Sequence, residues 1–144
     1  MKKTKTGVLG ALALGVWVTI TAVSASAQTV TRAVTSRSFG KEKPVGITTT
    51  FNRSDRTVHA YVSFARPFKC TMKSVWYAVK AKGLTSNQKL YEMSLKQNNY
   101  ASGHFSLKNN SAWPVGTYRI DVYANAKKIR TLKFSAIRNK FHAV

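Results

Sequence analysis

The acidic side chains are the first residues to examine for catalytic chemistry. The chain has four carboxylates, at Glu42, Asp55, Glu92 and Asp121. A glycosidase needs two carboxyl groups placed across one bond, and these four are too scattered to predict such a pair. Asp55 lies in an expected turn over residues 52–55 and is expected to bond local backbone amides. Asp121 is expected to form a weak, exposed ion pair with a neighbour such as Arg119.

The three histidines and the single cysteine give only a weak indication of a metal site. His59, His104 and His142 share no metal-ligand spacing, and a zinc site needs three or four converging ligands. His59 and His104 could join Cys70 in one metal site, or they could be histidines without a ligand.

Cys70 has no partner for an internal disulfide, so we expect it to be buried, with pairing between chains as the alternative. Its neighbours Lys69 and Lys73 would lower the thiol pKa, but the sequence shows no histidine base or orienting group for it. No serine has the G-x-S-x-G setting and there is no glycine-rich phosphate loop. We therefore expect a non-catalytic protein without a metal or cofactor.

Basic residues interleaved with aromatic residues are the stronger signal. The chain has 24 Lys and Arg and a formal net charge of +20. Arg grips phosphate, sulfate or carboxylate groups in a bidentate manner and Lys supplies point charge, while aromatic rings can stack on sugars or bases. The alternative is a solvated face that protects sheet edges from aggregation. The candidate ligand-binding residues are Arg66, Lys69, Lys73, Arg119, Tyr123, Lys127, Lys128, Arg130 and Lys133.

The N-terminus is typical of an export signal. Three lysines precede an uncharged stretch over residues 7–23, and Ala25-Ser26-Ala27 matches a signal peptidase site. We expect residues 1–27 to be a signal peptide cleaved after Ala27. An uncleaved anchor is the alternative, but the apolar run is just short of the ~18 to 20 residues that span a bilayer. The sequence therefore predicts a secreted or periplasmic protein that is not an integral membrane protein after cleavage.

The exported part, residues 28–144, keeps 21 of the cationic residues and all four acids, so its formal net charge is +17. Charge this one-sided raises association rates with anionic surfaces. The expected partners are anionic polysaccharide, lipopolysaccharide or nucleic acid, and a protein partner is a further possibility. The alternative is a basic bias shared by all exported proteins of the source.

The apolar pattern of residues 28–144 has a period of two residues, which predicts strands. Residues 28–45 form a basic N-terminal segment, with an expected edge strand over 29–36 and a loop over 38–43. Residues 46–137 form the expected domain and 138–144 a basic tail. The expected strands cover 47–51, 57–64, 72–80, 90–95, 104–107, 117–124 and 128–137. Residues 72–80 are apolar on both faces, which predicts a central strand.

The last two expected strands are joined by Asn125-Ala126 as a hairpin. In the second of these strands, Ile129 has the opposite parity to Leu132 and Phe134, which predicts a bulge. Seven short strands with a turn every 8 to 12 residues predict a sandwich or a barrel.

The segment Trp113-Pro114-Val115-Gly116-Thr117-Tyr118-Arg119-Ile120-Asp121-Val122-Tyr123 resembles the P-x-G-x-Y entry to the penultimate strand of bacterial immunoglobulin-like and fibronectin-III-like modules. The following residues, up to Phe134, are similar to the last hairpin of those modules, although many of them have Gly where Ala126 stands. The resemblance implies a tyrosine corner at Tyr118 and a core tryptophan at Trp76.

The expected fold is therefore all-β: a single immunoglobulin-like antiparallel β-sandwich of about seven strands, after a cleaved N-terminal signal helix. Such a fold serves many functions. The resemblance therefore implies a binding or structural module. Combined with the charge, it predicts a non-catalytic module that engages an anionic polymer or surface through a Lys/Arg-rich sheet face. The alternative is a protein-protein interaction or structural envelope module that uses a sheet edge or Cys70.

Overall fold

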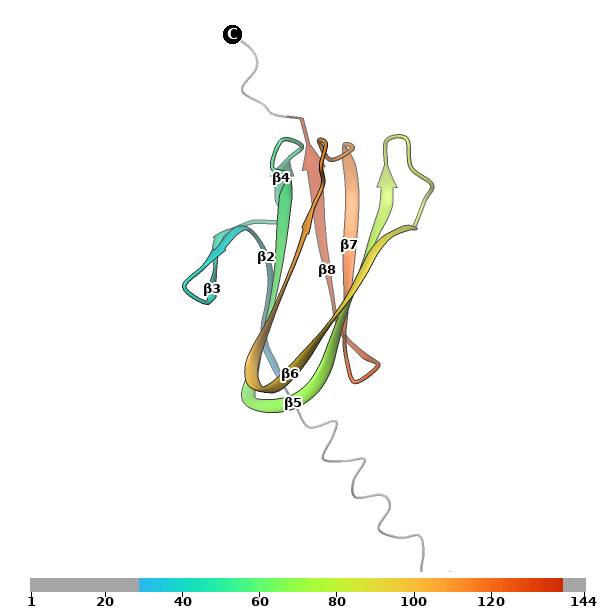
Figure 1. Cartoon of the computed structure of the whole chain (residues 1–144). Helices are drawn as coiled ribbons and strands as arrows, with labels where there is room; N and C mark the ends of the chain where they lie inside the picture. The colour runs from blue at the N-terminus through green and yellow to red at the C-terminus, as the bar shows by residue number, and fades with distance from the viewer. Residues whose placement is uncertain (1–28, 139–144) are drawn as a thin grey trace, which may run out of the picture.

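The computed structural model describes residues 29–138, which form seven strands and no helix (Figure 1). The predicted signal peptide and most of the predicted tail lie outside these residues. Within residues 29–138 there is no helix long and apolar enough to cross a membrane. The strands are β2 (Val30–Gly40), β3 (Lys43–Ile47), β4 (Thr50–Asn52), β5 (Thr57–Ala81), β6 (Gln88–Lys108), β7 (Gly116–Ala124) and β8 (Lys127–Ile137).

Two of the strands are much longer than the sequence pattern predicts. Residues 57–64 and 72–80 belong to one strand, β5, and residues 90–95 and 104–107 belong to one strand, β6. The prediction of separate strands was wrong because the β5–β6 pairing continues through the presumed breaks, with Phe68 opposite Tyr100 and Lys69 opposite Asn98. Register shifts around Phe68, and the positive φ of Asn99, absorb the bend without ending the pairing.

The bend makes each long strand part of both layers of a sandwich. Figure 1 shows β5 and β6 turning together at one end of the molecule, which we call the bend end. Layer one contains β3, β2, residues 57–63 of β5 and residues 102–108 of β6. Layer two contains residues 88–98 of β6, residues 69–81 of β5, then β7, β8 and β4. The expected all-β sandwich is confirmed, and 72–80 is central, between β6 and β7.

The N-terminal segment is more ordered than the sequence predicts. β2 pairs with β5 from Val30 to Ser36 and then continues to Gly40, where it pairs with β3. The predicted loop over 38–43 was therefore wrong. Lys41 and Glu42, both with positive φ, form a two-residue turn between two strands. The expected strand over 47–51 is divided between β3 and β4, and β4 runs parallel to β8.

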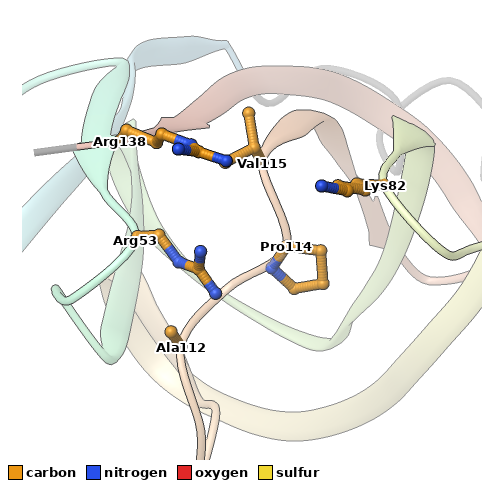
Figure 2. Close-up of a pocket in the computed structure, with 6 residues that line it drawn as sticks. All are labelled: Arg53, Lys82, Ala112, Pro114, Val115 and Arg138. Carbon is orange, nitrogen blue, oxygen red and sulfur yellow. The ribbon is translucent and has the colours of Figure 1, made fainter.

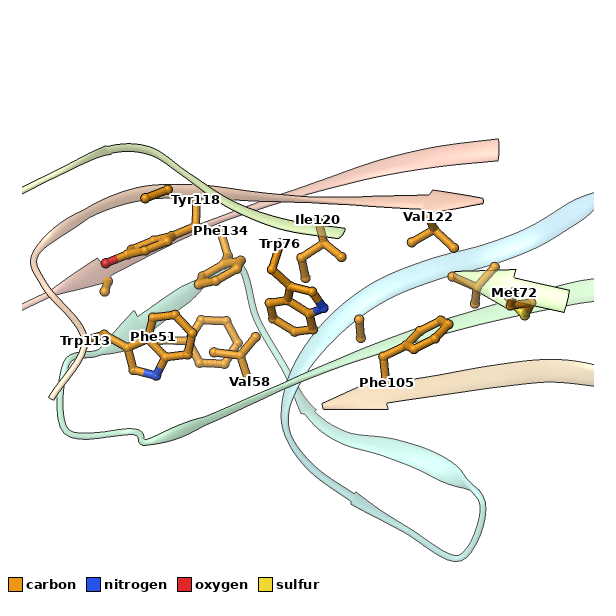
Figure 3. Close-up of a cluster of buried hydrophobic side chains, with 14 of the residues drawn as sticks. Phe51, Val58, Met72, Trp76, Phe105, Trp113, Tyr118, Ile120, Val122 and Phe134 are labelled. Carbon is orange, nitrogen blue, oxygen red and sulfur yellow. The ribbon is translucent and has the colours of Figure 1, made fainter. Parts of the chain in front are cut away.

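The core lies between the two layers and is rich in aromatic rings (Figure 3). Trp76, as expected, is fully buried, and its Nε1 donates a hydrogen bond to Ser74 Oγ at 3.0 Å. Phe134 stacks on Tyr118 with ring centroids 5.0 Å apart and meets Trp113 edge-on. Such contacts add to the free energy gained from burial. Tyr118 Oη donates to the carbonyl oxygen of Pro114, four residues upstream, which is the bond expected of a tyrosine corner.

The last hairpin forms as predicted. Asn125 and Ala126 both have positive φ, 49° and 69°, which is the conformation of a type I′ turn. Val122 pairs with Arg130 and Tyr123 with Lys128. Ile129 is therefore the extra residue of a bulge, which confirms the expected change of phase.

Candidate functional site

The surface of layer two that faces away from the core, here called the outer face, collects most of the predicted binding residues. Over residues 70–78 of β5 and 118–122 of β7 the even-numbered residues point into the core, so the odd-numbered ones between them, and Tyr123 after them, point outward. Residues that pair directly across antiparallel strands share a face, so the pairings arrange the outer face in three rows across β6, β5, β7 and β8. The rows are Ser94–Lys73–Tyr123–Lys128, Glu92–Val75–Asp121–Thr131 and Lys89–Tyr77–Arg119–Lys133.

The row that includes Lys73, here called row one, combines two lysines with an aromatic ring. Lys73 Nζ lies 5.0 Å from the ring centroid of Tyr123, a cation–π contact. Lys128, on the other side of Tyr123, is exposed. Row one therefore places a partly exposed and an exposed lysine on either side of a tyrosine ring.

The row that includes Arg119, here called row three, repeats this chemistry. The Cζ of Arg119 lies 4.1 Å from the ring centroid of Tyr77. Its Nη1 donates a hydrogen bond to Asn87 Oδ1 at 2.8 Å, which fixes the plane of the guanidinium group. Lys89 and Lys133 lie at the two ends of the row and are exposed. Stacked guanidinium groups suit bidentate recognition of anionic groups.

The acid between these two rows is withdrawn from the solvent. Asp121 is only 3% exposed, so the expectation of an exposed ion pair was wrong. Its Oδ1 accepts a hydrogen bond from Thr131 Oγ1 at 2.9 Å, and its Oδ2 lies 3.4 Å from Arg119 Nε and 3.8 Å from Lys128 Nζ. Both carboxylate oxygens therefore have partners and are shielded from the solvent, so Asp121 positions cations without displaying much negative charge.

The second acid of the middle row lies at its edge. Glu92 pairs with Lys89, whose Nζ lies 2.7 Å from Glu92 Oε1. This hydrogen bond lowers the pKa of Glu92 and raises the pKa of Lys89. Both side chains are well exposed, so the pair contributes little to stability. Arg119 and Lys128 share Asp121, and no ion pair joins Lys73 or Lys133 to a carboxylate of the described residues. The excess of cations over acids in the three rows leaves the face positively charged.

The other predicted binding residues lie elsewhere. Arg130 pairs with the buried Val122, so it shares the core-facing parity and does not lie on the outer face. Lys127 follows the hairpin turn at one end of β8. Arg66 and Lys69 are exposed at the bend of β5.

At the bend end, Lys69 lies close to the turn of the last hairpin. Thr71 N donates to Asn125 Oδ1 at 3.0 Å and Asn125 N donates to the carbonyl oxygen of Thr71 at 2.9 Å. An open hollow at this end is lined by Lys69, Lys96 and Asn125, and Cys70 also contributes to its wall. This end therefore extends the positive charge of the outer face.

The two histidines of the expected strands, His59 and His104, form a close pair. His59 Nδ1 lies 2.9 Å from His104 Nε2, and the ring of Phe39 stacks on His104 at 3.8 Å. Burial lowers the pKa of both, and the proximity of His59 lowers that of His104 further. Among the described residues no three His, Cys, Asp or Glu side chains converge as a metal site would require. His142 lies outside the described residues.

Cys70 is buried, as expected, and burial raises the pKa of its thiol. A raised pKa favours the unreactive thiol over the thiolate. The two neighbouring lysines do not outweigh burial. The cysteine is therefore a small apolar residue of the core.

Sequence reasoning missed three residues of the basic surface: Tyr77, Lys89 and Lys96. Tyr77 lies in the expected central strand 72–80, whose apolar faces do not predict a binding role, and Lys89 lies just outside the expected strand 90–95. The register between β5 and β6 places Tyr77 opposite Lys89 and Thr71 opposite Lys96. The outward parity of 73, 75 and 77 was the available signal, but the pairing partner could not be read from it.

Comparison with known proteins adds two distant structural likenesses. No family model and no curated protein matches the chain. A solved structure of Pseudomonas fluorescens alkylpurine DNA glycosylase AlkC, bound to DNA containing an abasic site analog, is similar with a TM-score of 0.42 and 15% identity over 78% of this chain. A β-D-glucoside glucohydrolase from Trichoderma reesei is similar with a TM-score of 0.37 and 16% identity over 76% of this chain. The chain spans 30% and 19% of those two proteins.

Proposed function

We propose that this protein is a secreted or periplasmic, non-catalytic module that binds an anionic polymer through the outer face of layer two. The observation that supports the proposal is the pair of cationic rows, each with a tyrosine beside a Lys or Arg. The formal charge of +17 on residues 28–144 adds long-range attraction to a polyanion. Membership of the immunoglobulin-like or fibronectin-III-like class remains a prediction.

The spacing of the rows favours a polymer over a single small anion. Rows one and three are four residues apart along β5 and β7, which corresponds to about 13 Å at the usual rise per residue. One phosphate or sulfate group cannot contact both rows, but a chain with repeated anionic groups can. The buried carboxylate of Asp121 between the rows leaves room for the neutral part of such a chain. Tyr77 and Tyr123 offer ring faces on which sugar rings or bases can stack.

Chromatography on immobilised heparin tests the proposal. We expect the purified protein to bind at low ionic strength and to elute with salt, because screening weakens contacts between exposed charges. Replacing one lysine in each row, with Lys73→Gln and Lys133→Gln together, should lower the salt concentration of elution. The slope of log affinity against log salt should fall by roughly one unit for each lost contact.

A matched variant controls for net charge. Lys41→Gln with Lys43→Gln also removes two positive charges, but from the β2–β3 hairpin, away from layer two. We expect this variant to elute close to the wild-type protein. Equal losses in the two double variants would refute the outer face as the binding surface, and no retention of the wild-type protein would refute polyanion binding altogether. Parallel measurements with lipopolysaccharide and duplex DNA identify the preferred polymer.

One observation favours the alternative of protein interaction through a sheet edge. β3 is the outermost strand of layer one, and its side chains Val45 and Ile47 are each 48% exposed. Unpaired edge strands can pair with an extended segment of another protein. Static light scattering and a pull-down from envelope extract test this alternative, which predicts association that resists salt and is lost with Val45→Lys. Cys70 does not support it, because its thiol is buried.

A further inference from the structure

The end of the sandwich opposite the bend holds a pocket of about 390 Å³ that sequence reasoning did not anticipate (Figure 2). Four chain segments meet there: the turn after β4, the residues after β5, the connection between β6 and β7, and the residue after β8. The lining residues are Arg53, Lys82, Ala112, Pro114, Val115 and Arg138. Figure 2 shows the charged ends of the two arginines and the lysine directed toward the Pro114–Val115 segment.

The backbone around the pocket is firmly held. Arg53 N donates to the carbonyl oxygen of Ile137 at 2.8 Å, and the carbonyl oxygen of Arg53 accepts from Trp113 N at 3.1 Å. Lys82 N donates to the carbonyl oxygen of Val115 at 2.9 Å. The Cα positions of Arg53 and Lys82 are therefore fixed relative to the pocket wall, which reduces the entropy lost on binding.

The three cations of this pocket have no neutralising acid. Asp55, the nearest acid in sequence to Arg53, accepts hydrogen bonds from Arg37 Nε and Asn52 N. Glu92 and Asp121 pair with cations of the outer face, and Glu42 lies in the turn between β2 and β3. Within residues 29–138, no carboxylate comes within 4 Å of the three charged groups of the pocket. An incoming anion therefore meets positive charge without a competing partner.

We propose that this pocket is a second binding site, for a phosphate or sulfate group carried on a compact body that packs against Pro114 and Val115. Three converging cations match an anion with several oxygens, and arginine can contact two of them at once. The apolar wall of Ala112, Pro114 and Val115 suits the uncharged body of such a ligand. The site is separate from the outer face and does not depend on the polymer-binding proposal.

Isothermal titration calorimetry with phenyl phosphate and with inorganic phosphate tests the site. Phenyl phosphate should bind with one-to-one stoichiometry and several-fold more tightly than inorganic phosphate, because its ring packs on the apolar wall. Arg53→Gln and Lys82→Gln should each weaken phenyl phosphate binding roughly tenfold, the usual effect of losing one charge-assisted hydrogen bond. Phenyl sulfate, titrated in parallel, separates a phosphate site from a sulfate site by which of the two binds more tightly.

The matched control is Arg32→Gln, which removes one exposed charge from β2 in layer one and should leave the affinity unchanged. The outer-face variant Lys73→Gln with Lys133→Gln should also bind phenyl phosphate normally, so the two proposals can fail independently. An affinity that falls equally in Arg32→Gln and Arg53→Gln would overturn the site. Absence of saturable binding to the wild-type protein would overturn it as well.

Discussion

Gly116, at the start of β7, is the position where an added methyl group should lower the free energy of unfolding most. A Cβ placed there would lie 2.2 Å from the carbonyl oxygen of Lys80 and 2.4 Å from the Cα of Ala81. Both are backbone atoms of the paired strand β5, so no side-chain rotation relieves the clash. Its φ of 155° is also one that L side chains rarely adopt. Overpacking usually costs about 1–3 kcal/mol and backbone strain about 1–3 kcal/mol more.

We therefore expect Gly116→Ala to lower the free energy of unfolding by about 3 kcal/mol or more. For a domain of this size, that corresponds to a melting temperature lower by at least about 12 °C. The assay is thermal unfolding followed by circular dichroism, with the urea midpoint as a second measure. Gly40→Ala is the control, because a Cβ there meets no atom within 4 Å, and its melting temperature should stay within a few degrees of wild type. If Gly116→Ala melted within about 2 °C of wild type, the close approach of β5 and β7 would be wrong.

Three further predictions concern the last hairpin, the histidine pair and the buried acid. Ala126→Gly should stabilise the protein by about 0.5–1 kcal/mol, because glycine adopts the φ of 69° at that turn position without the penalty of a Cβ; a lower melting temperature would contradict the type I′ turn. Stability should fall as the pH drops below about 6.5, because burial lowers the pKa of His59 and His104 in the folded state and the unfolded chain binds protons first; melting curves from pH 7.5 to 5 test this, and the double variant to Gln should flatten the profile. Asp121→Asn should cost about 1–2 kcal/mol in urea unfolding and yet raise the salt concentration of elution from heparin, whereas earlier elution would contradict the outer face as the binding surface.

The sequence pattern predicts much of the fold because alternation survives wherever one face of a strand is buried. Residues 57–64 alternate cleanly, and the structure buries Val58, Ala60 and Val62 as that pattern requires. The continuity of β5 could not be predicted, because Pro67 and its exposed neighbours have the composition of a turn. A bulged bend and a turn use the same residue types. Only the pairing with β6 distinguishes them.

The candidate site was only partly predictable, for a related physical reason. Parity within one strand places Lys73 and Tyr77 on the same face, and Arg119 and Tyr123 likewise. Which residue of one strand lies opposite which residue of the next depends on register, and register is set by bulges and turns that sequence composition does not fix. Lys128 and Arg130 illustrate the limit, because the extra residue at the bulge places these two even-numbered residues on opposite faces of the sheet.

The few acidic residues of this chain stabilise local structure and do not neutralise its positive charge. Asp55 holds a turn by accepting from Asn52 N. Asp121 fastens β7 to β8 through Thr131, and among the described residues no buried side-chain polar atom lacks a hydrogen-bond partner. Asp55 and Asp121 therefore each meet a local structural need, and the four acids of the chain cannot neutralise its 24 basic residues. Self-repulsion among the remaining cations destabilises the compact state, and a bound polyanion would relieve it while stabilising the fold by mass action. Heparin fragments should therefore stabilise this protein more than sodium chloride of equal ionic strength, because salt only screens the repulsion.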